Sequence, residues 1–311
     1  SAAVSIWMAM NEYGVWSLVA KVLIFAFVAN ILLWTYSRWQ PSLVFDKQKL
    51  KTHFNFGYKL SLTQIINTSF DNLYKVIIGK FFSAAQLGFF TRARSLEQLP
   101  SGFFVSAFNR VAYPLLASIN DDASRLKSIY SRLMKLIVFV ILPILFYLGI
   151  VAEPFIRWLL TEKWLPAVPY FQLLLISGMF YPIHKYNLNI CNVKGRSDLV
   201  LKLSMLQNAL LLIGAVSVIW YSIYGLLYSL VIVNVLVTFI NAFVSGNLID
   251  YGLKKQIKDL FPTFVLNIII GIILYFIHYY WLGSFNDLSI LVIIGLIYAF
   301  LYILLGYLFQ F

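Results

Sequence analysis

Charged residues are scarce in this chain: Asp, Glu, Lys and Arg make up 12% of its 311 residues, while hydrophobic residues make up 61%. A soluble globular domain is usually about one quarter charged. A water-soluble core could not hide so much apolar surface. The composition therefore excludes an ordinary soluble domain and favours a protein that crosses a membrane several times.

Cysteine is nearly absent, and the motifs of soluble enzymes are missing. The single cysteine, Cys191, cannot form a disulfide within the chain. The sequence has no P-loop, no dinucleotide-binding glycine motif and no HExxH motif, and His53, His184 and His278 are too scattered to suggest a metal site. We therefore expect no cofactor, no metal and no enzymatic activity, and we favour transport or lipid handling.

Long apolar stretches, in contrast, follow one another along almost the whole chain. A helix needs about 20 residues to cross the roughly 30 Å of hydrocarbon in a bilayer. We therefore predict an all-α integral membrane protein with about nine transmembrane helices. The predicted spans are residues 15–36, 56–80, 87–117, 133–152, 170–190, 199–221, 225–248, 260–282 and 288–311.

Lys and Arg alternate between the loops that join these spans. The segments 37–55, 118–135, 191–202 and 248–259 together hold fourteen of them, whereas the other loops hold only Arg157 and Lys163. Short positive loops stay in the cytoplasm. This pattern predicts that Ser1 lies outside and Phe311 inside. Because the chain starts outside without an initiator Met, we expect it to be the C-terminal part of a longer protein.

The predicted span 56–80 carries a polar stripe. Its members recur at three- and four-residue steps and so share one helix face: Gln64, Asn67, Thr68, Asp71 and Lys75. An ionisable group at bilayer depth is costly unless it faces a cavity or a partner. Two interpretations remain open: Asp71 and Lys75 form an ion pair that locks helix packing, or the stripe is the wall of a polar cavity.

The predicted span 87–117 carries two sets of polar residues. Arg94, Glu97, Ser101 and Asn109 fall on one broad face of the helix, and Arg92 and Arg110 fall on roughly the opposite face. We expect Arg94 and Glu97 to line a cavity. Arg92 and Arg110 are weaker candidates, since each could extend to its own membrane interface.

Lys185, just after Pro182 in the span 170–190, is a further candidate. It provides either a positive site near the cytoplasmic side or a side chain that reaches the inner headgroups. The ionisable residues inside the spans are then two acids and six bases: Lys59, Asp71, Lys75, Arg92, Arg94, Glu97, Arg110 and Lys185. A cavity with that balance favours an anionic passenger.

Three stretches of the chain resemble a known family. The longest is FGYKLSLTQIINTSFDNLYKVIIGKFFSAAQLGFFTRARSLEQLPSGFFVSAFNRVAYPLLASI (Phe56 to Ile119), with Asp71 followed by IIGK, then LGFF, LP and YP. The others are EKWLPAVPYFQLL (Glu162 to Leu174) and GRSDLVLK (Gly195 to Lys202). Over most of residues 40–240 the chain resembles Wzx-type polysaccharide flippases of the multidrug/oligosaccharidyl-lipid/polysaccharide exporter superfamily.

The resemblance implies a fold of two six-helix lobes around a central cavity, often followed by two extra helices. On that scheme residues 1–36 hold the last helix of the N-terminal lobe and 37–55 are the cytoplasmic lobe linker. Residues 56–248 are the second six-helix lobe, and 249–311 are two additional C-terminal helices. About five helices of the first lobe have no counterpart in this chain.

The same resemblance implies that the parent protein flips undecaprenyl-pyrophosphate-linked oligosaccharides across the bacterial cytoplasmic membrane, for O-antigen, capsule or exopolysaccharide assembly. The polymerase and chain-length regulator of the pathway would be partners. On this hypothesis Lys75, Arg94 and Lys185 compensate the pyrophosphate, and Asp71 or Glu97 couples to an ion. The groups that would bond sugar hydroxyls are those of Asn67, Asn72, Ser101 and Asn109.

Two alternatives remain open. A drug or cation antiporter of the same superfamily predicts an acidic, aromatic-lined cavity, which the excess of bases opposes. A membrane-embedded polysaccharide polymerase or glycosyltransferase predicts essential acids in an outer loop. Glu153 and Glu162 are the acids of the longest predicted outer loop.

Overall fold

The computed structural model describes residues 2–37, 45–281 and 285–308. All regular structure in these ranges is helical, with no strand, which confirms the predicted all-α class. Some predictions concern residues outside these ranges: Ser1 on the outer side of the membrane, Phe311 on the inner side, Leu282 as the end of a span, and residues 38–44 of the linker. The chain divides into two compact units, Ser1–Thr52 and His53–Phe311, which are described separately.

The first unit holds a helical hairpin. Helix α1 (Ala2–Met10) precedes α2 (Trp16–Tyr36), and the two pack against each other. The turn between them uses positive φ at Glu12 (61°) and at Gly14 (51°), a backbone region that glycine adopts without strain. Helix α2 occupies the first predicted span, whereas α1 was not predicted.

The second unit is a bundle that begins within α3. Its elements are α3 (Lys47–Phe81), α4 (Ala84–Ser118), α5 (Ala123–Ile150), α6 (Ala152–Leu160), the 3₁₀ helix η1 (Glu162–Ala167), α7 (Val168–Val193), α8 (Ser197–Val218), α9 (Ile223–Leu248), α10 (Leu253–Trp281) and α11 (Asp287–Leu308). Helix α3 starts nine residues before the predicted span, since hydropathy does not detect a polar helical turn. Asp46 accepts bonds from the amides of Gln48 and Lys49 at this start.

The ends of these helices follow from local side-chain chemistry. Ser83 and Gln86 form a reciprocal capping box at the start of α4, with amide-to-side-chain distances of 3.2 and 3.1 Å. Asp122 caps α5. Helix α7 ends at Val193, and Gly195 follows it with a φ of 69°, which lets Arg196 N–H reach the Cys191 carbonyl at 2.8 Å. This Schellman turn separates α7 from α8 without a long loop.

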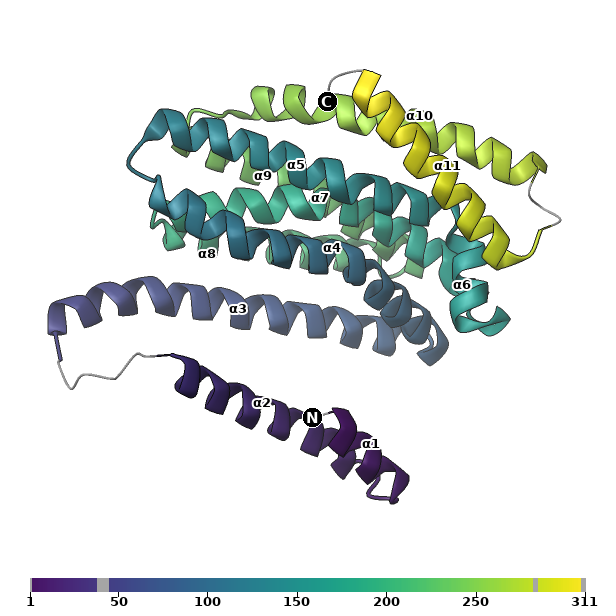
Figure 1. The fold of residues 1–311 in the computed structure, drawn as a ribbon, viewed down its shortest axis with the longest axis horizontal. Coiled ribbons are helices and arrows are strands. Elements are labelled where there is room, and N and C mark those ends of the chain that lie inside the picture. The colour runs from purple at the N-terminus through teal and green to yellow at the C-terminus, as the bar shows by residue number, and fades with distance from the viewer. Residues whose placement is uncertain (1, 38–44, 282–284, 309–311) are drawn as a thin grey trace. The chain divides into compact units, whose positions relative to one another are not determined.

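Helix α7 is the central element of the second unit. It packs against α4, α5, α8 and α9, and Figure 1 shows it between α5 and α4. Phe171 and Tyr186 of α7 have no exposed surface. Tyr186 stacks on Tyr130 of α5 with ring centroids 4.6 Å apart. Because α7 is enclosed on most sides, the other helices of the unit pack around it.

A buried polar cluster joins α7 to three other helices, α5, α9 and α10. The Asn187 Oδ1 atom of α7 accepts bonds from the hydroxyls of Tyr130 (2.9 Å) on α5 and Ser245 on α9. The Asn187 amide donates to Gln256 Oε1 of α10 at 3.1 Å. These bonds satisfy polar groups that are buried inside the bundle. The cluster therefore fastens α10 to the bundle.

Among the described residues, seven helices are long and apolar enough to cross a membrane: α2, α5, α7 with η1, α8, α9, α10 and α11. Every predicted span falls on a helix of the structure, including the spans on α3 and α4. Helices α3 and α4 have 35 residues each but are not among these seven, because their many polar and charged side chains lower their mean hydropathy. The count of nine transmembrane helices therefore stays a prediction.

Candidate functional site

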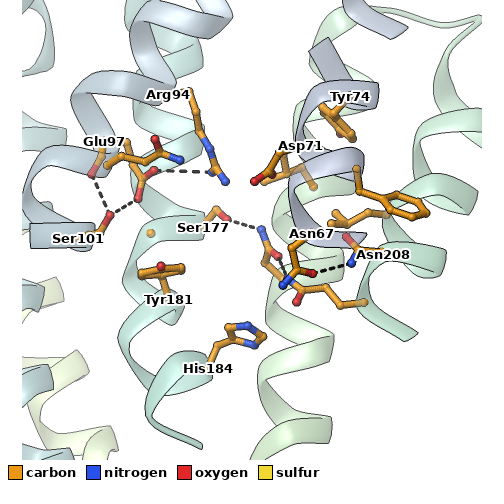
Figure 2. A pocket seen from close by; sticks show the side chains of 18 of the residues that line it. Asn67, Asp71, Tyr74, Arg94, Glu97, Ser101, Ser177, Tyr181, His184 and Asn208 are labelled. Atoms are coloured by element: carbon orange, nitrogen blue, oxygen red, sulfur yellow. Dashed lines mark hydrogen bonds and ion pairs between the residues drawn. The ribbon is translucent and has the colours of Figure 1, made fainter. Parts of the chain in front are cut away.

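A polar cavity of about 720 Å³ lies inside the second unit. Five helices line it, α3, α4, α7, α8 and α9, and Figure 2 shows their side chains converging on it. Of the predicted site residues, seven line this cavity: Asn67, Asp71, Lys75, Arg94, Glu97, Ser101 and Lys185. The structure thus brings together groups that are up to 118 positions apart in the sequence.

On the α4 side of the cavity, the Glu97 carboxylate forms an ion pair with Arg94. Arg94 Nη1 lies 3.6 Å from Glu97 Oε2, and the Ser101 hydroxyl donates to Glu97 Oε1 at 2.7 Å. Glu97 is only 3% exposed, whereas the Arg94 side chain is 29% exposed. An arginine beside a buried acid keeps most of its N–H donors for other groups. The Arg94 guanidinium is therefore directed into the cavity, as Figure 2 shows.

On the α3 side, Asp71 and Lys75 do not form the ion pair considered above. The salt bridges among the described residues do not include them, and Lys75 Nζ instead lies 3.4 Å from Asn72 Oδ1. The Asp71 carboxylate points across the cavity toward Arg94 in Figure 2. Asp71 also interacts electrostatically with Lys185 on α7. Asp71 therefore faces cations on two other helices, Arg94 of α4 and Lys185 of α7.

Amides and hydroxyls form a third wall. Gln207 of α8 donates to Asn234 of α9 at 3.2 Å, and Asn234 donates to the Ser177 hydroxyl of α7 at 2.7 Å. Asn208 of α8 donates to Asn67 of α3 at 2.8 Å. Such groups both donate and accept, so they can exchange these bonds for bonds to ligand hydroxyls.

A histidine and a lysine of α7 line the part of the cavity nearest the Asn187 cluster. His184 Nδ1 lies 2.6 Å from the Asn241 amide nitrogen of α9. The two side chains thus form a buried hydrogen-bonded pair between α7 and α9. Lys185 Nζ lies 5.7 Å from the centre of the Tyr181 ring, close enough for a cation–π contact.

The C-terminal half of helix α3 is fastened to the rest of the unit. The Tyr74 hydroxyl donates to the Leu226 carbonyl of α9 at 3.0 Å, and its ring packs against Phe90 of α4. Phe81 meets Trp220 edge to face with centroids 6.0 Å apart. These contacts and the Asn67–Asn208 bond hold the polar stripe of α3 toward the cavity.

Four predicted residues lie outside the cavity lining. Asn72 is exposed and contacts Lys75. Asn109 accepts a 2.6 Å bond from Asn189 of α7, because α4 packs directly on α7 beyond Ser101. Arg92 lies over the Trp164 ring of η1 at 5.3 Å. Arg110 is exposed, so both arginines face away from the cavity.

Sequence reasoning missed several lining residues. The cavity also includes Gln98, Ser177, Tyr181, Gln207, Asn208, Asn234 and Thr238. A signal for some of them was present, since amide side chains inside strongly apolar spans are costly without partners. Which of them face one another depends on how the helices are rotated, and the sequence does not show this.

The cavity walls can bind an anion and a polyhydroxylated group together. They carry three cations, Lys75, Arg94 and Lys185, against two acids, Asp71 and Glu97. Within the described ranges, no three His, Cys, Asp or Glu side chains lie close enough together to hold a metal ion. The lining groups can compensate the charge of a ligand and form hydrogen bonds with it.

Fold and site together define a multi-pass, all-helical membrane protein with a charged cavity inside its bundle. The model of a family described as polysaccharide biosynthesis protein matches residues 1–169, more than half of the chain. The chain belongs to that family, which confirms the resemblance drawn from its motifs.

Curated relatives agree with this assignment. The teichuronic acid biosynthesis protein TuaB of Bacillus subtilis (strain 168) is 27% identical over 250 residues, which cover 78% of this chain and 51% of the relative. The succinoglycan biosynthesis transport protein ExoT of Rhizobium meliloti (strain 1021) is 25% identical over 58% of this chain and 37% of its own length. The lipopolysaccharide biosynthesis protein WzxC of Escherichia coli (strain K12) is 24% identical over 55% and 35%. The chain thus spans at most about half the length of these relatives.

The fold is also found in a solved structure. The lipid II flippase MurJ, in an inward closed conformation, superposes with a TM-score of 0.73 and 15% sequence identity. The match covers 98% of this chain and 64% of that chain. At this identity the similarity establishes the fold alone.

Proposed function

We propose that the protein containing this chain translocates a lipid-linked oligosaccharide, joined through pyrophosphate to undecaprenol, across the bacterial cytoplasmic membrane for surface polysaccharide assembly. The observation that carries the proposal is the cavity with an excess of cations and a wall of amides and hydroxyls. Such a cavity suits a headgroup that combines negative charge with sugar hydroxyls. The family and the names of the relatives support the same substrate class.

On this proposal, Arg94, Lys75 and Lys185 compensate the pyrophosphate. A phosphate group costs too much to move through hydrocarbon unless cations and hydrogen-bond donors replace its water. Arg94 can bind phosphate oxygens with two parallel N–H bonds, whereas the two lysines act as point charges. The polyprenyl tail remains in the lipid, so the cavity needs to accept only the headgroup.

The amide wall would bind the sugars. Asn67, Ser101, Asn208 and Asn234 present both donors and acceptors to the cavity. Asp71 or Glu97 would couple transport to an ion by changing its partner or its protonation. No catalytic step is part of this proposal.

The arrangement in the membrane belongs to the same proposal. Basic loops lie in the cytoplasm, and the C-terminus lies on that side. Residues 1–36 close a first lobe, 37–55 link the lobes, 56–248 form the second lobe and 249–311 add two helices. The polymerase and chain-length regulator of the pathway would receive the product outside.

The test is the leaflet in which the substrate accumulates. We would delete the complete gene in its host and measure the fraction of lipid-linked oligosaccharide accessible to a glycosidase added outside. Protected substrate should accumulate and become accessible on complementation. Substrate that reaches the outside normally but stays unpolymerised would contradict the proposal and favour a polymerase. In that case Glu153→Gln with Glu162→Gln should abolish chain elongation.

A further inference from the structure

The carboxylate of Glu97 is the most deeply buried charge of the cavity wall. Its side chain is 3% exposed and contacts Arg94 and Ser101 of its own helix, α4. A buried carboxylate is stable only where it is paired and hydrogen-bonded. The position of Glu97 therefore determines where Arg94 can place its charge.

Gly178 of α7 provides the space in which Glu97 lies. A Cβ atom at this position would overlap Glu97 Oε1 and lie only 3.2 Å from Cδ and 3.3 Å from Cγ. Non-bonded carbon atoms are at their optimal separation at about 3.5–4.0 Å. Every residue except glycine would thus occupy part of the volume that the carboxylate fills.

We propose that Gly178 is a positioning residue for the anion site: the absence of a side chain there holds Glu97 against α7 and so directs the Arg94 guanidinium into the cavity. Among the described residues, Arg94 has the ion pair with Glu97 and no hydrogen bond. Most of its five N–H donors are therefore available to a ligand. The role of Arg94 as an anion ligand rests on the proposed function, whereas the placement of Glu97 does not.

An alanine at this position should move the carboxylate rather than unfold the helices. The atoms nearest to the added Cβ belong to the outer part of a flexible side chain, not to backbone. The carboxylate would have to rotate away from α7 and lose Arg94, Ser101 or both. Glu97→Asp shortens the side chain by one methylene. It should therefore relieve the overlap in Gly178→Ala, although it leaves a gap beside Gly178 in the wild type.

The experiment is chemical modification of Arg94 by phenylglyoxal, followed by mass spectrometry of the Arg94 peptide. The protein would be expressed from its complete gene and placed in lipid nanodiscs. Gly178→Ala should speed the modification about three- to fivefold, the range expected for loss of a partly exposed ion pair. Glu97→Gln, which adds no atom, should speed it similarly. Adding Glu97→Asp to Gly178→Ala should bring the rate of Arg94 modification back to within about twofold of the wild-type rate, because the two residues are in contact and their effects are coupled.

A matched control separates positioning from general packing. Gly214→Ala also places a Cβ against a side-chain oxygen, that of Ser229, but at the contact of α8 with α9 and outside the cavity lining. It should leave the Arg94 rate unchanged. Arg157 of α6, far along the chain from both sites, should react at one rate in every variant, which verifies the fold.

Two results would overturn the proposal: an Arg94 rate unaffected by Gly178→Ala, or an equal increase in Gly214→Ala. Inorganic pyrophosphate then tests the proposed function separately. It should protect Arg94 in the wild type and protect it less in Gly178→Ala. If pyrophosphate fails to protect the wild type while Gly178→Ala still speeds modification, the positioning role stands and the pyrophosphate role of Arg94 is contradicted.

Discussion

Asn208 of α8 donates a hydrogen bond of 2.8 Å to Asn67 of α3, a residue 141 positions earlier in the chain. The bond joins the polar stripe of α3 to the amide wall of the cavity. Asn208 also donates to the Ser204 carbonyl of its own helix at 2.9 Å, which fixes its side-chain orientation. The two asparagines therefore link cavity geometry to helix packing.

Breaking this pair should lower stability modestly. Asn208→Leu leaves Asn67 Oδ1 without its partner and should reduce the free energy of unfolding by about 1 kcal/mol, since interhelical hydrogen bonds in membranes contribute about that much. Denaturant unfolding in mixed micelles measures this change in the free energy of unfolding. The double variant with Asn67→Leu should cost less than the sum of the single ones. Strictly additive effects would contradict the coupling. Asn30→Leu, whose amide bonds only within α2, is the control.

Arg94 should be required for transport. Arg94→Ala should lower translocation at least about tenfold, because a hydrogen bond to a charged group contributes about 1.5–3 kcal/mol. Arg94→Lys keeps the charge but loses the planar donor pair, so it should be intermediate. Glycosidase accessibility and membrane abundance are measured together. Arg110→Ala, exposed and outside the cavity, should transport normally. Normal transport by Arg94→Ala would assign the residue to packing.

The Asn187 cluster should be required for folding and not for transport chemistry. Asn187→Leu removes the partner of Tyr130, Ser245 and Gln256 at once and should destabilise the protein by about 2 kcal/mol or more. Tyr130→Phe removes one donor and should cost less. The fraction of monodisperse protein after solubilisation reports the difference. Ser131→Ala, at the half-buried position next to Tyr130, serves as the control. Full yield of Asn187→Leu would show that the cluster is dispensable.

The orientation of the chain can be tested by cysteine labelling. In a Cys191→Ala background, Lys163→Cys should react with an impermeant maleimide in intact cells. Lys254→Cys should react only after permeabilisation, because basic loops remain in the cytoplasm. Both Lys163 and Lys254 are exposed on the protein surface, so a difference in labelling reports the side of the membrane on which each position lies. Reversed labelling would overturn the predicted topology.

Much of the architecture could be predicted from the sequence. Every predicted span falls on a helix, because a stretch of about 20 apolar residues has few alternatives in a bilayer. The short helices α1 and α6 and the early start of α3 were not predicted, since length and hydropathy do not detect short or polar helices.

The cavity face of α4 shows where helical periodicity stops being informative. Arg94, Glu97 and Ser101 were assigned to one face with Asn109, and the first three line the cavity. Asn109, two turns further, contacts Asn189 of α7 instead. Periodicity shows which side of a helix is polar, but not which neighbour covers that side along its length.

The amino-acid sequence by itself determined the class of protein, its long helices and the polar faces of α3 and α4. Apolar length and periodic polarity are properties of single segments, so they can be read without the fold. Tertiary structure decided which groups meet: Asn208 with Asn67, Asn234 with Ser177, and Glu97 with the open space at Gly178. These relationships depend on how the helices rotate and pack against one another, which arises from contacts between segments distant in the sequence.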